Sequence, residues 1–229
     1  MSNEQSITIS PAAGERVGWY AIDGNHSAAS SSTRDVTATS NRIVNQYGGE
    51  VLIGMEMQLD EYLILTPYIG YSGMLIDQRF DTRAQLVGSD GMSLQETVSG
   101  MYNGFTGGAR WKYTKKNIEW YASTSGAVQY LTAKYQGHQI DTAVNYDITH
   151  SDEHNTLAVR GKIEAGASYT LKGWTIGVTS GAEYISAVPQ IVAADRSSGG
   201  FGVWGDNPTH IGWDSSMVYE LGLNLSYQF

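Results

Sequence analysis

The sequence predicts an all-β protein, an eight-stranded antiparallel up-and-down transmembrane β-barrel, on the strength of three observations. Charged residues make up only 16% of the 229 residues, whereas the chain has 27 glycines, 15 tyrosines and 6 tryptophans. Apolar and polar residues alternate with a period of two along most of the chain, which is typical of strands with one apolar face. Short and long connections alternate between these segments, as they do in outer-membrane barrels.

The composition excludes several other classes of protein. The chain has no cysteine, so it cannot be a disulfide scaffold. No run approaches 18 apolar residues, which excludes a helical membrane protein. A net charge of −9 without a basic cluster argues against nucleic-acid binding. The abundance of aromatic residues argues against intrinsic disorder.

Each predicted strand is a segment over which the alternation persists. The clearest is the last, MVYELGLNLSYQF at 217–229, which places apolar residues on one face and mostly polar or small residues on the other. Ordinary strands have about 5–6 residues, so this length suits a tilted membrane-spanning strand with an overhang. The other predicted strands are residues 15–23 (the weakest), 46–59, 62–78, 98–113, 118–135, 154–171 and 174–188.

The connections fall into two groups by length. The short ones are 59–61, 114–117 and 172–173, and the long ones are roughly 24–44, 79–95, 137–153 and 189–215. This asymmetry predicts short periplasmic turns, long external loops and both termini on the periplasmic side. We expect residues 1–13 to be an N-terminal periplasmic segment and residues 14–229 to be the barrel. The start of the chain, MSNEQSITIS, lacks the features of a signal peptide.

A soluble lipocalin-like barrel would carry its apolar face inside, so the direction of that face must be inferred. Trp120 and Tyr130 are ten residues apart on the apolar face, a spacing that covers about 25 Å in a tilted strand, and nearly all strand charges fall on the polar face. Both features favour a membrane barrel. One aromatic girdle, near the short turns, is predicted to contain Trp111, Tyr113, Trp120, Tyr169, Trp174, Tyr227 and Phe229; the other contains Tyr47, Tyr71, Tyr130, Tyr184 and Tyr219.

The polar face is predicted to line the barrel interior with a network of charges. Its members are Glu50, Glu56, Arg110, Lys112, Glu119, Arg160, Lys162, Glu164, Glu183 and Glu220. An eight-stranded barrel is only wide enough to be filled by side chains, and unpaired buried charges are costly. We therefore favour a plug of salt bridges over a path for ions or solutes.

The C-terminal segment LNLSYQF, with Leu225, Tyr227 and Phe229 at alternate positions, resembles the terminal strand signal of bacterial outer-membrane proteins. LTPYIGY at 65–71 is similar to a strand of small OmpA-like barrels. NRIVNQYGGEVLIG and other segments between 41 and 188 resemble, more loosely, the pore-forming family that includes the Legionella major outer-membrane protein. The first resemblance implies assembly by the barrel-assembly machinery into the outer membrane of a Gram-negative bacterium, among outer-membrane lipid and lipopolysaccharide. The last implies a pore.

The segment HSDEH at 150–154 offers the only candidates for site chemistry. His150 and His154 could bind a transition metal with Asp152 and Glu153, but the segment falls in a predicted external loop, where nothing fixes the two imidazoles close together. Ser151, His150 and Asp152 could be a catalytic set, but a triad depends on geometry and not on adjacency. We predict no catalytic, metal or cofactor site and no enzymatic activity.

The long loops offer a possible binding surface. Phe201, Trp204 and Trp213 in the last loop could anchor a partner, because tryptophan is enriched at binding hot spots, or they could pack against one another. We therefore expect a structural or surface-binding role, with other envelope proteins as partners of the loops. The alternative is a small pore for ions or solutes.

Overall fold

The computed structural model describes residues 2–10, 21–24, 35–86, 91–142, 145–194 and 207–227. Nearly all of them lie in strands, and none of the described residues forms a helix that could cross a membrane. The strands are β1 (Ser2–Ile9), β2 (Val36–Gly54), β3 (Met57–Gln58), β4 (Leu63–Leu86), β5 (Gly91–Lys115), β6 (Ile118–Asp141), β7 (Tyr146–Leu171), β8 (Trp174–Val192) and β9 (His210–Tyr227).

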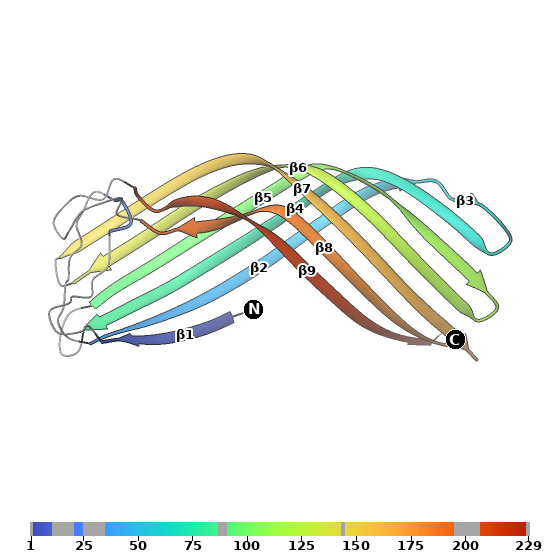
Figure 1. Cartoon of the computed structure of the whole chain (residues 1–229), viewed down its shortest axis with the longest axis horizontal. Helices are drawn as coiled ribbons and strands as arrows, with labels where there is room; N and C mark the ends of the chain where they lie inside the picture. The colour runs from blue at the N-terminus through green and yellow to red at the C-terminus, as the bar shows by residue number, and fades with distance from the viewer. Residues whose placement is uncertain are drawn as a thin grey trace.

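The strands form one antiparallel sheet in the order β1-β2-β4-β5-β6-β7-β8-β9, with β3 pairing with β4 beyond the end of β2. The sheet is strongly curled, as Figure 1 shows. The all-β, antiparallel prediction is therefore confirmed. Among the described residues, however, no pairing joins β1 to β9, and the sheet is an open half-barrel instead of the predicted closed barrel.

The open edge has a local cause in β1. This strand has 8 residues and pairs only with Val36–Ile43 of β2, so it leaves the rest of β2 at the edge. The sequence predicts an N-terminal segment at 1–13 and a first strand at 15–23. Residues 15–20 lie outside the described residues, whereas 2–9 form β1 with Ser2 opposite Ile43, away from the short turns. Its weak alternation, SNEQSITI, gave no sign of a strand.

Two short turns lie where the sequence predicts them. Lys172 and Gly173 both have positive φ, at 49° and 83°, as a two-residue turn between β7 and β8 requires. Before β4, the Asp60 carboxylate accepts hydrogen bonds from the backbone N–H groups of Tyr62 and Leu63, at 2.6 and 3.0 Å. We call the part of the sheet next to these turns the turn half (47–54, 57–58, 63–75, 101–115, 118–131, 157–171, 174–185 and 217–227) and the remainder of β2–β9 the loop half.

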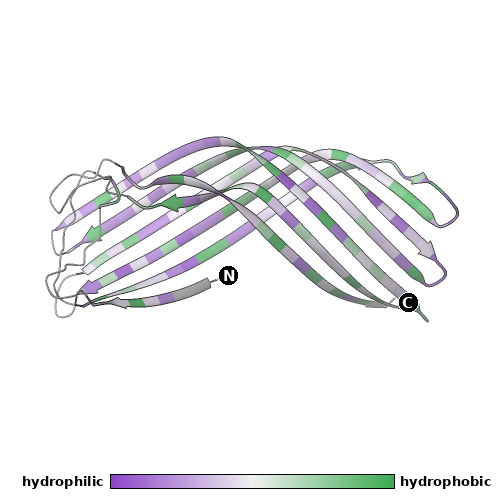
Figure 2. Ribbon diagram, viewed as in Figure 1, coloured by the Kyte–Doolittle hydropathy of each residue, from purple (hydrophilic) through white to green (hydrophobic). Residues whose placement is uncertain are grey.

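The strands are longer than predicted because the polarity of their two faces reverses along them. In β6, residues at even positions face outward throughout. Those from Ile118 to Tyr130 are mostly apolar, whereas Thr132, Lys134, Gln136 and His138 are polar (Figure 2). The apolar pattern therefore ends in mid-strand. Much of the predicted loops 79–95 and 137–153 consists of strand, since β4 continues to Leu86 and β6 to Asp141.

The inward face reverses in the opposite sense. In the loop half it forms an apolar core, in which Val98 and Ala133 have no exposed surface and Tyr135 almost none. In the turn half the apolar residues face outward, and Leu221 and Leu223 on β9 are 81% and 86% exposed. The loop half is thus built like a soluble β-protein, while the turn half has its apolar surface outside.

Candidate functional site

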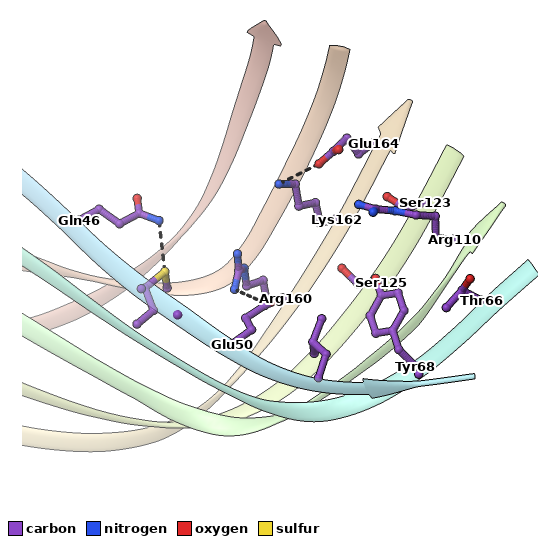
Figure 3. Close-up of a pocket in the computed structure, with 15 residues that line it drawn as sticks. Gln46, Glu50, Thr66, Tyr68, Arg110, Ser123, Ser125, Arg160, Lys162 and Glu164 are labelled. Atoms are coloured by element: carbon purple, nitrogen blue, oxygen red, sulfur yellow. Dashed lines mark hydrogen bonds and ion pairs between the residues drawn. The ribbon is translucent and has the colours of Figure 1, made fainter. Parts of the chain in front are cut away.

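The predicted interior charges meet in the turn half around Arg160 of β7. Its guanidinium contacts the carboxylates of Glu183 on β8 and of Glu50 on β2, the latter at 3.2 Å. Glu183 pairs from the adjacent strand, but β2 is not a neighbour of β7 in the sheet. The Glu50 contact therefore crosses the interior of the curled sheet, and Figure 3 shows these two side chains reaching toward each other from opposite walls.

A second cluster of charges surrounds Lys162 on the same strand. Its ammonium lies 3.2 Å from Glu164 and 3.3 Å from Glu220 of β9. The Tyr121 hydroxyl donates to Glu164 at 2.8 Å, and the Arg110 guanidinium lies over the Tyr121 ring. The cluster thus joins side chains of β5, β6, β7 and β9.

Two more predicted residues pair near the turns, and one does not join the network. Lys112 and Glu119 form an ion pair at 2.8 Å between β5 and β6. Glu56 lies exposed in the connection between β2 and β3 and forms no ion pair with any described residue. Alternation fails for Glu56 because the backbone leaves the strand at 55–56.

The charges line a hollow of about 530 Å³ inside the turn half. Tyr68, Ser123 and Ser125 complete its polar wall, together with Glu50, Arg110, Arg160, Lys162 and Glu164 (Figure 3). A space of this size holds water or a small polar solute. The interior of the turn half therefore combines an ion-pair network with a chamber whose wall also contains apolar side chains such as Leu52 and Met74.

A layer of buried side chains separates this chamber from the loop half. Tyr102, Leu131 and Ile185 pack together with at most 1% of their surface exposed, and we call these three residues the seal. The Tyr102 hydroxyl donates to the carbonyl of Ala187 across the interior at 2.8 Å. Beside it, the Gln78 amide donates to the carbonyl of Pro189 at 2.7 Å. These buried side chains fill the interior of the sheet at this level.

The predicted aromatic residues occupy two levels of the outward face. At the turn end, the Trp174 and Tyr227 rings pack with their centroids 4.8 Å apart, and Trp111, Trp120 and Tyr169 are also exposed. Tyr113 is half-buried there, 6.0 Å from the Tyr62 ring. The second level, near the boundary of the two halves, holds exposed residues on five strands: Tyr47, Tyr71, Tyr130, Tyr184 and Tyr219.

The predicted C-terminal assembly signal lies partly within the described chain. Leu225 and Tyr227 face outward on β9, at the open edge of the sheet, whereas Phe229 lies outside the described residues. Of the predicted loop aromatics, Phe201 and Trp204 also lie outside them. Trp213 is part of β9 and packs against the interior core instead of standing in an external loop.

The strand geometry divides the HSDEH segment between two faces of β7. His150 Nε2 contacts the carbonyl oxygen of Thr209 at 2.9 Å, and the Asp152 carboxylate accepts a hydrogen bond from Ile211 N–H at 3.0 Å. Ser151 lies between them and points to the opposite face, so these three residues form no single site. Within the described ranges, no group of three or more His, Cys, Asp or Glu side chains is arranged to hold a metal ion.

A half-buried carboxyl in the loop half, that of Glu96, lies outside every strand that the alternation predicts. Glu96 accepts a hydrogen bond from the Tyr135 hydroxyl at 2.8 Å, beside the His150 ring. Burial raises the pKa of Glu96 above its ordinary value of 4.5, and the weaker effect of the Tyr135 hydrogen bond opposes it. The fold therefore favours the protonated form of Glu96.

The raised pKa predicts that Glu96→Gln increases the free energy of unfolding at neutral pH but not at acidic pH. Below about pH 4 the carboxyl is protonated in both the folded and the unfolded chain, and the substitution should be nearly neutral. As the pH rises above 4.5, the unfolded state releases the proton first, so the wild type loses stability that the glutamine variant keeps. Urea unfolding of both proteins at pH 4 and pH 8 checks this, and equal differences at the two pH values would contradict it.

A scan of protein-family models and searches of curated proteins and of solved structures gave no significant match to this chain. Its function is therefore inferred from the arrangement of its own side chains.

Proposed function

We propose that the chain is an integral β-barrel of a Gram-negative outer membrane, with a structural or surface-binding role and a sealed interior. The observation that carries this proposal is the reversal of polarity along the strands. An exposed apolar face limited to the turn half fits a protein that is immersed in lipid over that half only. The aqueous environment of the loop half then accounts for its polar surface and apolar core.

The height of the apolar band supports the same proposal. Trp120 and Tyr130 mark its two aromatic levels on β6, and both are exposed. Ten residues at ~3.3 Å each, tilted by ~40°, span about 25 Å, the height of the lipid-facing band of outer-membrane barrels. In this orientation the short turns are periplasmic, and the loop half extends outside the cell.

Lipid also provides a reason for the sheet to close. Backbone groups that lack hydrogen-bond partners are very costly in the hydrocarbon layer, so open sheet edges do not persist there. We propose that the edges on the β1–β2 side and on β9 come together in the membrane to complete a closed barrel, assembled by the barrel-assembly machinery. The contact between Arg160 and Glu50 already links β7 to β2 across the interior.

The seal favours a structural or binding role over the alternative of a pore. A solute path would have to pass Tyr102, Leu131 and Ile185, which are fully packed. The chamber below them is therefore a blind one. The surface left for a partner is that of the loop half and its connections.

Conductance in planar lipid bilayers tests this proposal. The purified wild-type protein is expected to insert into phospholipid vesicles, as detected by flotation, and to give no steady channels in a bilayer. Tyr102→Ala, which removes the largest side chain of the seal, should increase the frequency of conductance events. Tyr130→Ala makes the same chemical change on the outward face of β6 and should give no more conductance than the wild type. Stable channels from the wild type would contradict the sealed interior.

A further inference from the structure

The outward face of the loop half carries an ordered set of polar side chains on four adjacent strands. Arg79, Thr97, Gln136 and Ser151 lie opposite one another on β4, β5, β6 and β7. The neighbouring row contains Asp81, Gln95, His138 and Thr149 in the same register. We call these eight residues the polar platform. With strands about 4.8 Å apart, the platform is about 14 Å wide.

The platform is hollowed in two places. A depression of about 470 Å³ is lined by members of both rows, among them Thr97, Gln136 and Thr149. A second one, of about 360 Å³, extends toward β2 and shares Arg79 and Gln95 with the first. A ligand longer than one ring could therefore follow the surface across several strands.

The chemistry of the platform suits a polyhydroxylated ligand. Arg79 is paired with Asp81 at 3.0 Å, and His138 Nε2 lies 2.7 Å from the Asp147 carboxylate, so both side chains already have an acidic partner. The remaining groups are the amides of Gln95 and Gln136 and hydroxyls such as that of Ser151. Amides and hydroxyls both donate and accept hydrogen bonds, as sugar hydroxyls do.

The height of the platform above the apolar band indicates which molecule could present a saccharide to it. The last row with apolar side chains contains Leu75 and Met101, and Arg79 and Thr97 lie four residues beyond them. Four residues cover about 13 Å along the strand, or roughly 10 Å along the membrane normal at a ~40° tilt. The polar headgroup layer of a bilayer extends only about 5–8 Å beyond the hydrocarbon on each side. The platform therefore stands above ordinary phosphate headgroups.

We infer that the polar platform binds the saccharide headgroup of a glycolipid in the outer leaflet. This inference rests on the proposed function, because that orientation sets the platform above the phosphate groups, at the height that the sugars of a glycolipid reach. The glycolipid would lay its acyl chains against the exposed apolar face of the turn half, for example Phe105 and Val128, and its sugars against Gln136 and Thr149.

Native mass spectrometry of the full chain, released from mixed micelles, tests the inference. The probes are a rough lipopolysaccharide with a short core saccharide, phosphatidylglycerol, and the free core oligosaccharide. We expect the wild type to retain the lipopolysaccharide in preference to phosphatidylglycerol, and the free oligosaccharide to compete for it. Gln136→Leu should reduce retention about two- to tenfold, the effect of losing one or two neutral hydrogen bonds.

A matched control separates recognition from general disturbance of the sheet. Gln85→Leu makes the same change on an exposed position of β4 that lines neither depression, and it should retain the lipid like the wild type. Thr149→Ala provides a second platform variant should Gln136→Leu fold poorly. Equal retention by platform and control variants, equal retention of phosphatidylglycerol, or no competition by the oligosaccharide would overturn the inference. Failure to float with phospholipid vesicles would instead overturn the proposed function.

Discussion

Replacing Arg160 by methionine is expected to lower the free energy of unfolding by about 3–5 kcal/mol, the usual cost of breaking a buried ion pair from one side. The Arg160 side chain is 18% exposed and that of its partner Glu183 only 6%. Without the guanidinium, the Glu183 carboxylate stays in the interior with no described cation in contact. Glu50 also loses its link across the chamber.

Two further variants make this expectation specific. Adding Glu50→Gln and Glu183→Gln to the Arg160 variant removes the orphaned charges and should recover most of the loss. Lys134→Met breaks the ion pair between Lys134 and Glu153, whose side chains are 61% and 53% exposed, and should cost less than about 1 kcal/mol. Urea unfolding in detergent micelles measures all of these values. A loss for Arg160→Met no larger than that for Lys134→Met would mean that the network does not stabilise the interior.

Alternation in the sequence was enough to identify the strands of the turn half and the direction of each side chain. It placed Arg160, Lys162 and Glu164 on one face and Leu157 on the other, and the structure has the same division. Such positions are predictable because a strand has a period of exactly two, so one clear run fixes the orientation of every residue in it. Glu56 departs from this rule only because the strand is interrupted beside it.

The seal and the upper part of the strands could not be predicted in the same way. Tyr102 and Leu131 lie on the inward face, where a strand with an apolar lipid-facing side is expected to carry polar residues. Beyond Tyr130 the alternation continues with reversed polarity, which looks like a polar loop when only one face is followed. Along such a strand the same positions keep facing outward, but the outward residues change from apolar to polar. This pattern would have indicated one continuous strand that passes from one environment to another.

The edges of the sheet were also beyond prediction from sequence. The pairing of β1 with β2 depends on backbone hydrogen bonds, and residues 2–9 have too few apolar side chains to mark a strand. Closure depends in the same way on which edges meet. In the proposed barrel, the lipid and the assembly machinery bring the two edges together. The sequence of one chain does not show which edges will meet.

The reversal of polarity predicts which outward residues of a strand lie within the membrane and which lie in water. Because the chain has no cysteine, a single cysteine at any position carries a nitroxide label at that site alone. Val128 and Gln136 both face outward on β6, eight residues apart and on opposite sides of the reversal. A label on the first should lie within the hydrocarbon, and a label on the second should lie in water.

Electron paramagnetic resonance of these labels in phospholipid vesicles tests the central claim most directly. At Val128→Cys, collisions with oxygen should dominate over collisions with a water-soluble nickel chelate. At Gln136→Cys the order should be reversed, and labels at intervening outward positions such as Tyr130 and Thr132 should show the crossing point. Strong access of the nickel chelate to both Val128→Cys and Gln136→Cys would contradict a membrane-embedded turn half.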